Sequence, residues 1–142
     1  MNIYFSCSIT GGRAEEATYQ AIVKELEEQG HEVPTAHLSS PDVMELENMV
    51  DAVDIYERDM AWIRGCDAVV AEVSSPSHGV GYEIAYALSL RKPVLCCYKK
   101  DKKVSKIITG NISPGLTVIV YEHDEDAATE VRKFTKLLQK GW

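Results

Sequence analysis

The sequence has no excess of positive charge. Its 142 residues include 15 Lys and Arg against 22 Asp and Glu, which gives a formal net charge of −7. A protein that coats a nucleic-acid polymer or lies on an anionic membrane needs a basic surface. We therefore expect neither kind of partner. A small anion is not excluded, because it needs only a local site.

The sequence also has no long apolar segment. A transmembrane helix needs a run of about 18 apolar residues, and no such run occurs. The N-terminal residues Met1, Asn2, Ile3 and Tyr4 have neither the basic segment nor the apolar segment of a secretory signal peptide. We therefore expect a soluble, cytoplasmic protein without a membrane partner.

Cysteine is sparse, and its spacing is unlike that of a metal site. The four cysteines, Cys7, Cys66, Cys96 and Cys97, form no C-x-x-C motif. This disfavours a zinc site or a thioredoxin-like motif, and we expect no metal. We expect all four to be small buried hydrophobic residues. Cys96 and Cys97 are adjacent in an apolar run and are predicted to point to opposite faces of a strand.

Apolar runs alternate with helical patterns along the chain, which is typical of an α/β fold with a parallel sheet. The predicted strands span residues 3–7, 31–34, 67–73, 93–98 and 116–121. The predicted helices span residues 14–29, a segment from Asp42 to about Arg64, and residues 80–90, 104–109 and 125–139. These elements predict a flavodoxin-like, doubly wound, five-stranded parallel sheet in the order 2-1-3-4-5, with three α/β/α layers in one domain over residues 1–142.

The longest predicted helix has an amphipathic pattern. Met49, Val53, Tyr56, Met60 and Ile63 recur at spacings of four and three residues. We expect this stripe to face the core.

Two loops fall where a sheet of this order binds ligands, beyond the carboxyl ends of the first and third strands. The first loop, residues 6–13, combines Gly11, Gly12 and hydroxyl groups with Arg13, and leads into a helix. Backbone N–H groups at a helix start bind phosphate well, so we expect an anion site in this loop. The alternative is a glycine-rich tight turn without a ligand.

Two further interpretations of the first loop are weaker. Cys7 and Arg13 have the C-x₅-R spacing of cysteine-dependent phosphatases, in which a thiolate attacks phosphate. However, Ala14 stands where those enzymes have Ser or Thr, and no Asp-Pro pair supplies a general acid. The loop also resembles the phosphate loop of flavodoxins, but residues 74–79 lack the aromatic side chains that flavin needs.

The second loop, which begins at Ser74, leads to a candidate nucleophile. Gly79 and Gly81 allow a ligand to approach the backbone closely. Glu83 is expected in the first helical turn, where the helix dipole favours its ionised form. Such a carboxylate is either a nucleophile or an ordinary capping group. Asp59 borders the apolar stripe, so it is either a second catalytic carboxylate or a member of a surface ion pair.

In this combination the chain resembles the nucleoside 2-deoxyribosyltransferase superfamily, and within it the 2'-deoxynucleoside 5'-monophosphate N-glycosidases. The most specific matches are residues 79–83 and the region of Asp59. The other matching segments are residues 3–9, 11–13, 19, 22–23, 35, 37, 57, 62, 69–73, 76–77, 93, 95–96, 104–105, 108 and 110. The resemblance thus covers nearly the whole chain.

The resemblance implies a role for each part of the site. Glu83 falls on the nucleophile that attacks the anomeric carbon, Asp59 on an assisting carboxylate, and Tyr4 on the tyrosine that orients the nucleophile. Ser8, Gly11, Gly12 and Ser77 fall on phosphate-binding positions, and Tyr19 and His37 on the substrate pocket. The complete substrate-binding set that we expect is Ser6, Cys7, Ser8, Ile9, Thr10, Gly11, Gly12, Arg13, Tyr19, His37, Ser77, Gly79, Ser105, Lys106 and Ile107, of which residues 105–107 enter the site from the partner of a homodimer.

The reaction that this implies is hydrolysis of a 2'-deoxynucleoside 5'-monophosphate to a free base and 2-deoxyribose 5-phosphate, without a cofactor. The first alternative is a nucleoside 2-deoxyribosyltransferase, in which a second base replaces water. The other is a non-catalytic module that binds a nucleotide or flavin. Thr10 stands where the family often has arginine, which weakens one phosphate contact, and Arg13 and Lys106 are the candidates to compensate.

Overall fold

Four parallel strands form the centre of the structure, a computed structural model that describes residues 1–141. They are β1 (Ile3–Ser6), β2 (Ala68–Glu72), β3 (Val94–Lys99) and β4 (Leu116–Tyr121). Their order is β1-β2-β3-β4. The register places Tyr4 beside Val69, and Val69 beside Val94.

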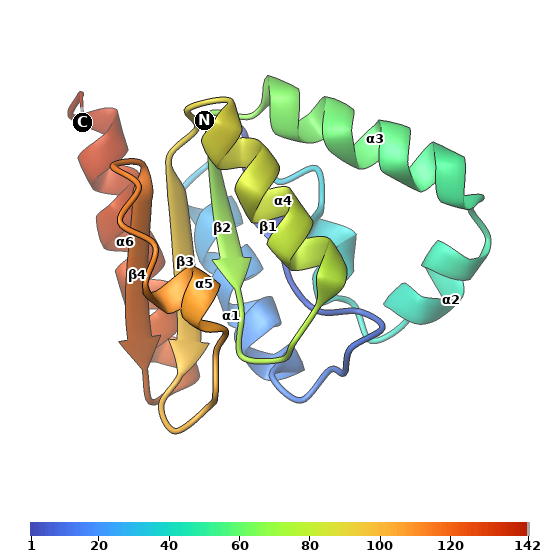
Figure 1. Ribbon diagram of the computed structural model, residues 1–142, viewed down its shortest axis with the longest axis horizontal. Helices are drawn as coiled ribbons and strands as arrows, with labels where there is room; N and C mark the ends of the chain where they lie inside the picture. Colours follow the sequence, from blue (N-terminus) through green and yellow to red (C-terminus); the bar gives the residue numbers. More distant parts are fainter. Residues whose placement is uncertain (142) are drawn as a thin grey trace.

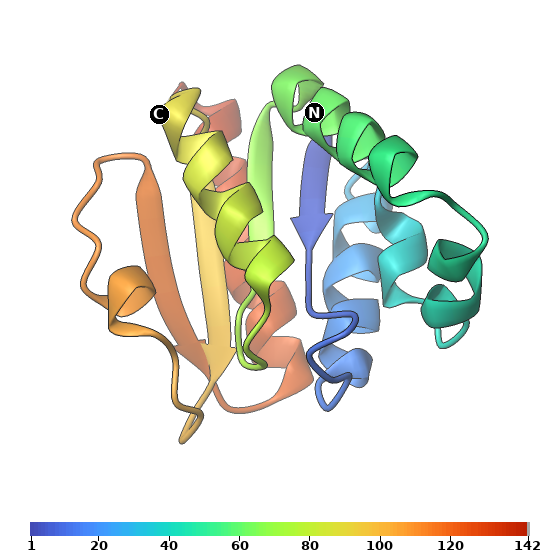
Figure 2. The ribbon, with the colours of Figure 1, turned by 45° about the vertical axis from the view of Figure 1, so that its right-hand side comes forward.

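Helices cover both faces of this sheet (Figures 1 and 2). The α-helices are α1 (Glu16–Glu28), α2 (Val43–Asn48), α3 (Ala52–Gly65), α4 (His78–Ser89), α5 (Lys106–Thr109) and α6 (Asp124–Gln139), and a 3-10 helix, η1, spans Ala36–Ser39. Helices α1 and α6 pack on one face, whereas α3 and α4 pack on the other. The predicted three-layer α/β/α arrangement with a parallel sheet is therefore confirmed.

Alternation of side chains along the strands produces a separate core on each face. Ile3 and Phe5 pack against α1 and α6, whereas Tyr4 packs against α3 and α4. Cys97 lies in the first core and Cys96 in the second, so the prediction that they point to opposite faces is confirmed. All four cysteines are buried and free, as expected.

The prediction of a strand over residues 31–34, the second of the five, is wrong. Residues 31–34 contribute one isolated parallel bridge, between Asn2 and Glu32, and the five-stranded order is not confirmed. Pro34 has no backbone N–H for a ladder, and the chain enters η1 two residues later. The segment is therefore too short to extend the edge of the sheet beyond β1.

The long helix predicted up to Arg64 is also wrong, because it is two helices. The helical conformation is interrupted between α2 and α3, where Asp51 has an extended backbone (φ −66°, ψ 147°). As a result only Met60 and Ile63 of the apolar stripe are buried. Met49 is 80% exposed and Val53 is 67% exposed.

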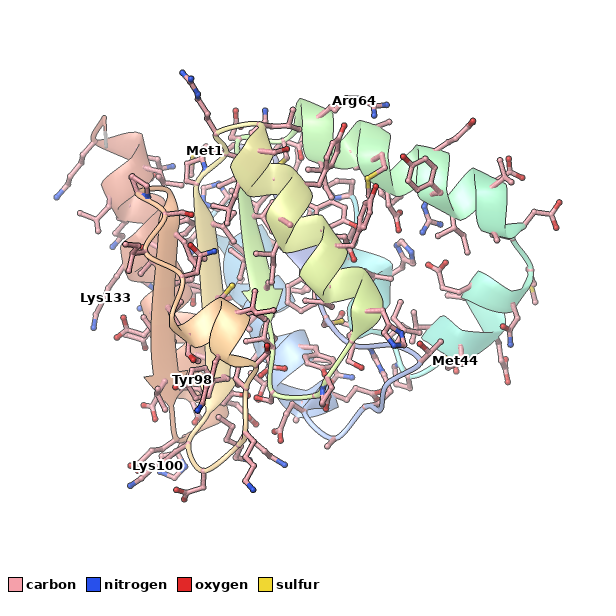
Figure 3. All side chains as sticks on the ribbon, in the orientation of Figure 1. Met1, Met44, Arg64, Tyr98, Lys100 and Lys133 are labelled. Atoms are coloured by element: carbon pink, nitrogen blue, oxygen red, sulfur yellow. The ribbon has the colours of Figure 1, made fainter. Side chains whose placement is uncertain are left out.

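The carboxyl ends of the strands gather the loops of interest at one edge of the sheet. Figure 3 places Lys100, which directly follows β3, at this edge, and Met1 at the opposite edge. Residues 6–13 follow β1, and residues 73–77 follow β2. Both loops therefore leave the sheet on the same side. Within residues 1–141, none of the helices has the length and apolar character needed to cross a membrane.

The packing of α1 against the sheet and α6 predicts a difference between two leucine variants. Leu26 of α1 is fully buried, so Leu26→Ala should lower the free energy of unfolding by about 2–5 kcal/mol. Leu137 of α6 is 56% exposed, and Leu137→Ala should change it by less than about 0.5 kcal/mol. Urea denaturation measures both values, and equal losses in the two variants would contradict this packing.

Candidate active site

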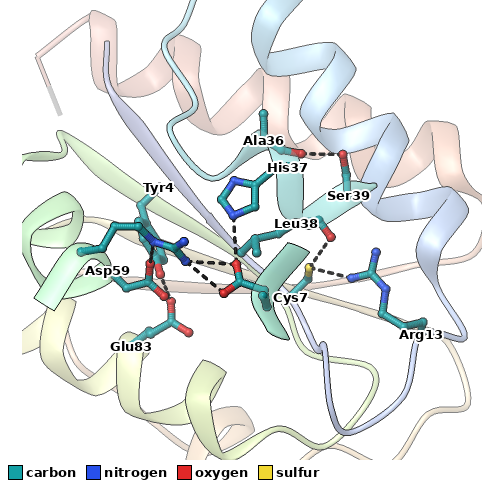
Figure 4. A network of polar contacts seen from close by, with 11 residues as sticks. Tyr4, Cys7, Arg13, Ala36, His37, Leu38, Ser39, Asp59 and Glu83 are labelled. Atoms are coloured by element: carbon teal, nitrogen blue, oxygen red, sulfur yellow. Dashed lines mark hydrogen bonds and ion pairs between the residues drawn. The ribbon is translucent and has the colours of Figure 1, made fainter. Parts of the chain in front are cut away.

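Three side chains from three separate elements meet on the face of the sheet covered by α3 and α4 (Figure 4). Tyr4 comes from β1, Asp59 from α3 and Glu83 from α4. The Tyr4 hydroxyl donates a hydrogen bond to Glu83 Oε2. The structure thus brings together the three residues that the sequence predicts as catalytic.

The local sequence explains why Glu83 is free to face Tyr4. Helix α4 begins at His78, two residues earlier than predicted, because the Ser77 hydroxyl accepts a hydrogen bond from the backbone N–H of Val80 at 3.3 Å. Glu83 therefore lies in the second helical turn and not in the first. The alternative that it is an ordinary capping carboxylate is excluded by this position.

Burial controls the electrostatics of this cluster. It raises the pKa of Glu83 to about 7, and the hydrogen bond from Tyr4 opposes that rise. It also raises the pKa of Tyr4 far above the usual range of a phenol, so Tyr4 remains a neutral donor. Burial raises the pKa of Asp59 too, against the opposing effect of the adjacent Arg58. Near neutral pH, Glu83 is therefore present in both its ionised and its neutral form.

A network that the sequence analysis missed holds Asp59 in place. Arg58 Nε donates to Asp59 Oδ1 at 2.9 Å, and Arg58 Nη2 donates to Glu47 Oε1 at 3.0 Å. His37 Nε2 also lies 3.0 Å from Glu47 Oε1, and the Arg58 guanidinium stacks 4.8 Å from the centre of the Trp62 ring. The only signal in the sequence is the adjacency of Arg58 and Asp59. Nothing in the sequence pattern pairs Arg58 with Glu47.

The two predicted ligand loops touch each other. A Cβ atom at Gly11 would lie 2.0 Å from the carbonyl oxygen of Pro76, so only glycine allows this approach. Gly12 has a φ of +120°, which side chains rarely adopt. Between the loops lies a small cavity of about 150 Å³, lined by Thr10, Gly11, Pro76, Ser77 and His78.

Several residues of the first loop are buried rather than open to this cavity. Ser6, Cys7 and Ser8 are buried, whereas Ile9 is half-buried and Thr10 is exposed. The hydroxyls of Ser6 and Ser8 have no hydrogen-bond partner within residues 1–141. The Ser6 hydroxyl nevertheless lies near enough to Glu83 to favour its ionised form and so to lower its pKa.

Arg13 is engaged within the protein. Its guanidinium donates to the carbonyls of Ser8 and Ser40, both at 3.1 Å, forms an ion pair with Glu16 and stacks 4.9 Å from the centre of the buried Tyr19 ring. The expectation that Arg13 compensates for Thr10 by contacting phosphate is therefore not supported by its position. Its contacts instead fix the shape of the first loop.

Cys7 does not have the properties of a phosphatase nucleophile. Its thiol is buried and donates to the Leu38 carbonyl at 3.6 Å. Burial raises its pKa to about 12, although Arg13 acts in the opposite direction. A thiol with this pKa carries almost no thiolate at neutral pH. The C-x₅-R spacing is thus a chance match.

Ser105, Lys106 and Ile107 lie apart from Glu83 in the same chain. All three are exposed, and Ser105 caps α5 by accepting from the backbone N–H of Ile107 at 3.3 Å. Ser105 and Ile107 line an apolar cavity of about 750 Å³ between α4 and α5, to which Glu83 does not contribute. Within residues 1–141, no three His, Cys, Asp or Glu side chains are grouped closely enough to hold a metal ion.

A family model described as nucleoside 2-deoxyribosyltransferase matches residues 3–136. The chain belongs to this family. It is 37% identical to a 5-hydroxymethyl-dUMP N-hydrolase of Esox lucius over 145 aligned residues, with 99% of both chains covered. It is 36% identical to the protein of the same name from Mus musculus, with 99% of this chain and 83% of the mouse protein covered.

Solved structures support the same fold. A CMP N-glycosidase of Clostridium botulinum superposes with a TM-score of 0.72 at 18% identity, covering 94% of this chain and 99% of that one. A 2-deoxyribosyltransferase of Bacillus psychrosaccharolyticus superposes with a TM-score of 0.59 at 17% identity and covers 90% of each chain. At these identities the likeness concerns the fold alone.

The Tyr4–Glu83 hydrogen bond predicts the direction of a pKa change. Tyr4→Phe removes the donor that stabilises the ionised carboxylate, so the pKa of Glu83 should rise further above about 7. Carbon-13 NMR of labelled glutamate carboxyls measures this directly. Tyr86→Phe is the control, because Tyr86 lies on the same helix but its hydroxyl contacts Arg64. An unchanged or lower pKa in Tyr4→Phe would refute the assignment.

Proposed function

We propose that the protein hydrolyses the N-glycosidic bond of 2'-deoxynucleoside 5'-monophosphates to a free base and 2-deoxyribose 5-phosphate. The observation that carries this proposal is the half-buried Glu83, which is hydrogen-bonded by Tyr4 and lies beside a second carboxylate, Asp59. The names of the fish and mouse relatives point to the same bond in a deoxyuridine monophosphate.

In the proposed mechanism the ionised Glu83 attacks the anomeric carbon of the sugar as the bond to the base breaks. Positive charge develops on the sugar ring in this transition state, as in glycoside hydrolysis. Asp59 donates a proton to the departing base, so the base leaves neutral. Water then attacks the glycosyl ester on Glu83, and Asp59 takes the proton from that water.

The two carboxyls differ in their hydrogen-bond partners: Arg58 donates to Asp59 and favours its ionised form, whereas Tyr4 donates to Glu83. Both are partly withdrawn from water, which raises both pKa values. Only Glu83 receives the Tyr4 hydrogen bond, which favours its ionised form and aims its second oxygen. Tyr4 therefore acts as the residue that orients the nucleophile. No metal or cofactor has a role in this mechanism.

The two touching loops are the proposed 5'-phosphate site. Ser77 and Gly79 lie at the N-terminus of the twelve-residue helix α4, where backbone N–H groups and the helix dipole favour an anion. The proposed partners from the first loop are the Ser8 hydroxyl and the backbone of residues 9–12. His37 is proposed to complete the pocket for the sugar and the base. Tyr19, which the resemblance also placed there, is completely buried in the core between the sheet and α1, so it is not part of this proposal.

Base release tests this function. The protein should release base from deoxynucleoside 5'-monophosphates without an added acceptor base, as followed by chromatography. Glu83→Gln should lower kcat at least about 1,000-fold, because an amide cannot form the ester. Glu28→Gln, at an exposed position of α1, is the control and should retain full activity.

Three results would contradict the proposal or select an alternative. Release of base only with an acceptor base would select the transferase. Nucleotide binding without base release would leave a non-catalytic module. Retained activity in Glu83→Gln would remove the nucleophile assignment.

We also propose that the protein is a cytoplasmic homodimer whose partner subunit completes the site. Four free cysteines fit a reducing compartment. Large apolar side chains are exposed on α3, α4 and α5 and in the turn before α3, and a cluster of this kind is unusual for a surface in contact with water. They are Met49, Val53, Tyr56, Tyr82 and Ile107. A second copy on this surface would cover them and bring the partner's residues 105–107 toward the loop at Ser77.

Mixed dimers test the contribution of the partner. Ser105→Asp keeps a capping oxygen at the start of α5 but should repel the substrate phosphate, and Glu83→Gln removes the nucleophile. Each variant alone should be nearly inactive. Mixing them at equal concentration should restore about a quarter of the wild-type activity, because one of two sites is intact in half of the dimers.

Light scattering measures the oligomeric state beside this assay. The wild type should have twice the mass of one 15.8 kDa chain. A monomeric wild type, or no activity regained on mixing, would contradict the shared site.

A further inference from the structure

A second buried carboxyl lies outside the proposed active site. Glu72, the last residue of β2, is completely buried. The nearby Lys99 forms an ion pair with Glu15 at 3.4 Å and not with Glu72. Burial raises the pKa of Glu72 to about 7. A carboxyl in this environment is costly unless donors surround it, so its hydrogen bonds decide what it does.

Hydrogen bonds around Glu72 link the ends of three strands, β2, β3 and β4. Glu72 Oε1 accepts from the backbone N–H of Ser74 at 3.2 Å, from the Ser74 hydroxyl, and from the Tyr121 hydroxyl at the end of β4 at 3.2 Å. The Ser74 hydroxyl in turn accepts from the backbone N–H of Lys99, at the end of β3, at 2.8 Å. Ser74 is therefore fixed from both sides, and its position depends on Glu72.

The segment that Ser74 begins carries the second ligand loop. Three residues later Ser77 caps α4, the helix that holds Glu83. Between them, the Pro76 carbonyl lies against Gly11 so closely that no side chain fits there. A shift of Ser74 would therefore move Ser77 and press on the first loop at the same time.

We propose that Glu72 is a positioning residue, whose carboxyl holds the loop of residues 74–77 in the shape that binds the substrate 5'-phosphate. The proposal rests on the proposed function for its substrate. It assigns to Glu72 no contact with the substrate. Its effect is transmitted through Ser74 to Ser77 and Gly11.

The charge on Glu72 determines how firmly it holds the loop. An ionised carboxylate accepts hydrogen bonds more strongly than a neutral carboxyl, so the loop is held more firmly above pH 7 than below it. Within residues 1–141, no positively charged group forms an ion pair with Glu72, because Lys99 and Lys102 pair with Glu15 instead. The groups that face Glu72 are Glu15, Thr18 and Tyr19 of the α1 region, Cys7 after β1, Cys97 of β3, Tyr121 of β4 and, through Thr18, Asp124 of α6.

Glu72→Gln tests the proposal, because glutamine keeps an acceptor oxygen but is neutral at every pH. At pH 8 the KM for a deoxynucleoside 5'-monophosphate should rise about 3- to 10-fold, and kcat should change less than about 2-fold. At pH 6, where the wild-type carboxyl is also neutral, the two KM values should converge. The matched deoxynucleoside, which lacks the phosphate, should show no such difference.

Glu122→Gln is the matched control, since Glu122 is exposed and directly follows Tyr121, the last residue of β4. It should leave both parameters unchanged at both pH values. A KM ratio that is the same at pH 6 and pH 8, or a loss confined to kcat, would overturn the proposal. So would an equal effect on the nucleotide and the nucleoside.

An NMR titration separates this proposal from the proposed function. The backbone amides of Ser74, Ser75 and Ser77 should shift with a midpoint near pH 7 in the wild type and in Glu83→Gln, but not in Glu72→Gln. The absence of that midpoint overturns the proposal, whether or not the protein releases base. If the midpoint is found in a protein that is inactive on all deoxynucleotides, the proposed function fails and the coupling of Glu72 to the loop stands.

Discussion

The hydrogen bond from the buried Tyr4 to the half-buried Glu83 is the constraint on which the rest of the site depends. A carboxylate that leaves water must gain hydrogen bonds or lose its charge. Tyr4 supplies the hydrogen bond from the middle of β1, where the register with Val69 fixes its position. The sheet therefore fixes the position of the donor, and α4 supplies the carboxylate. The other contacts of the site act on the second carboxylate, Asp59, and on the two ligand loops.

The environment of the second carboxylate, Asp59, depends on the interruption between α2 and α3. Arg58 contacts both Asp59 and Glu47, and Glu47 lies 11 residues earlier in the sequence. In one continuous helix, those residues would be separated by about 16 Å along the axis. The turn at residues 49–51 folds α2 back and allows a contact of 3.0 Å. The sequence pattern therefore does not predict the turn that brings Glu47 to Arg58 beside Asp59.

The sequence predicts well what local pattern determines. The four strands, the two faces for Cys96 and Cys97, and the meeting of Tyr4, Asp59 and Glu83 all follow from alternation, topology or resemblance. It fails where a contact distant in sequence decides. The short segment of residues 31–34 resembles a strand, and Met49 and Val53 resemble a buried stripe, because periodicity does not say which partner is available.

Arg58 and Glu72 were missed for the same reason. Arg58 is one charge among many on an acidic helix, and its importance comes from Glu47 and Trp62. Glu72 stands in an apolar run that indicates only a buried strand, and its importance comes from Ser74 and from Tyr121, which lies 49 residues away. No spacing rule connects these positions.

The net charge of −7 gives this geometry a consequence for substrate binding. A phosphate approaching an acidic protein gains nothing from the overall field, and Arg13 is committed to carbonyls within its own loop. The proposed phosphate site therefore depends on backbone N–H groups and hydroxyls, whose attraction declines steeply when distance or angle is poor. Recognition of this kind tolerates little movement of the loops. Within residues 1–141, the first loop offers no free cation to the phosphate. The site therefore needs rigid loops, and two contacts supply that rigidity: Pro76 against Gly11, and Ser74 hydrogen-bonded to Glu72.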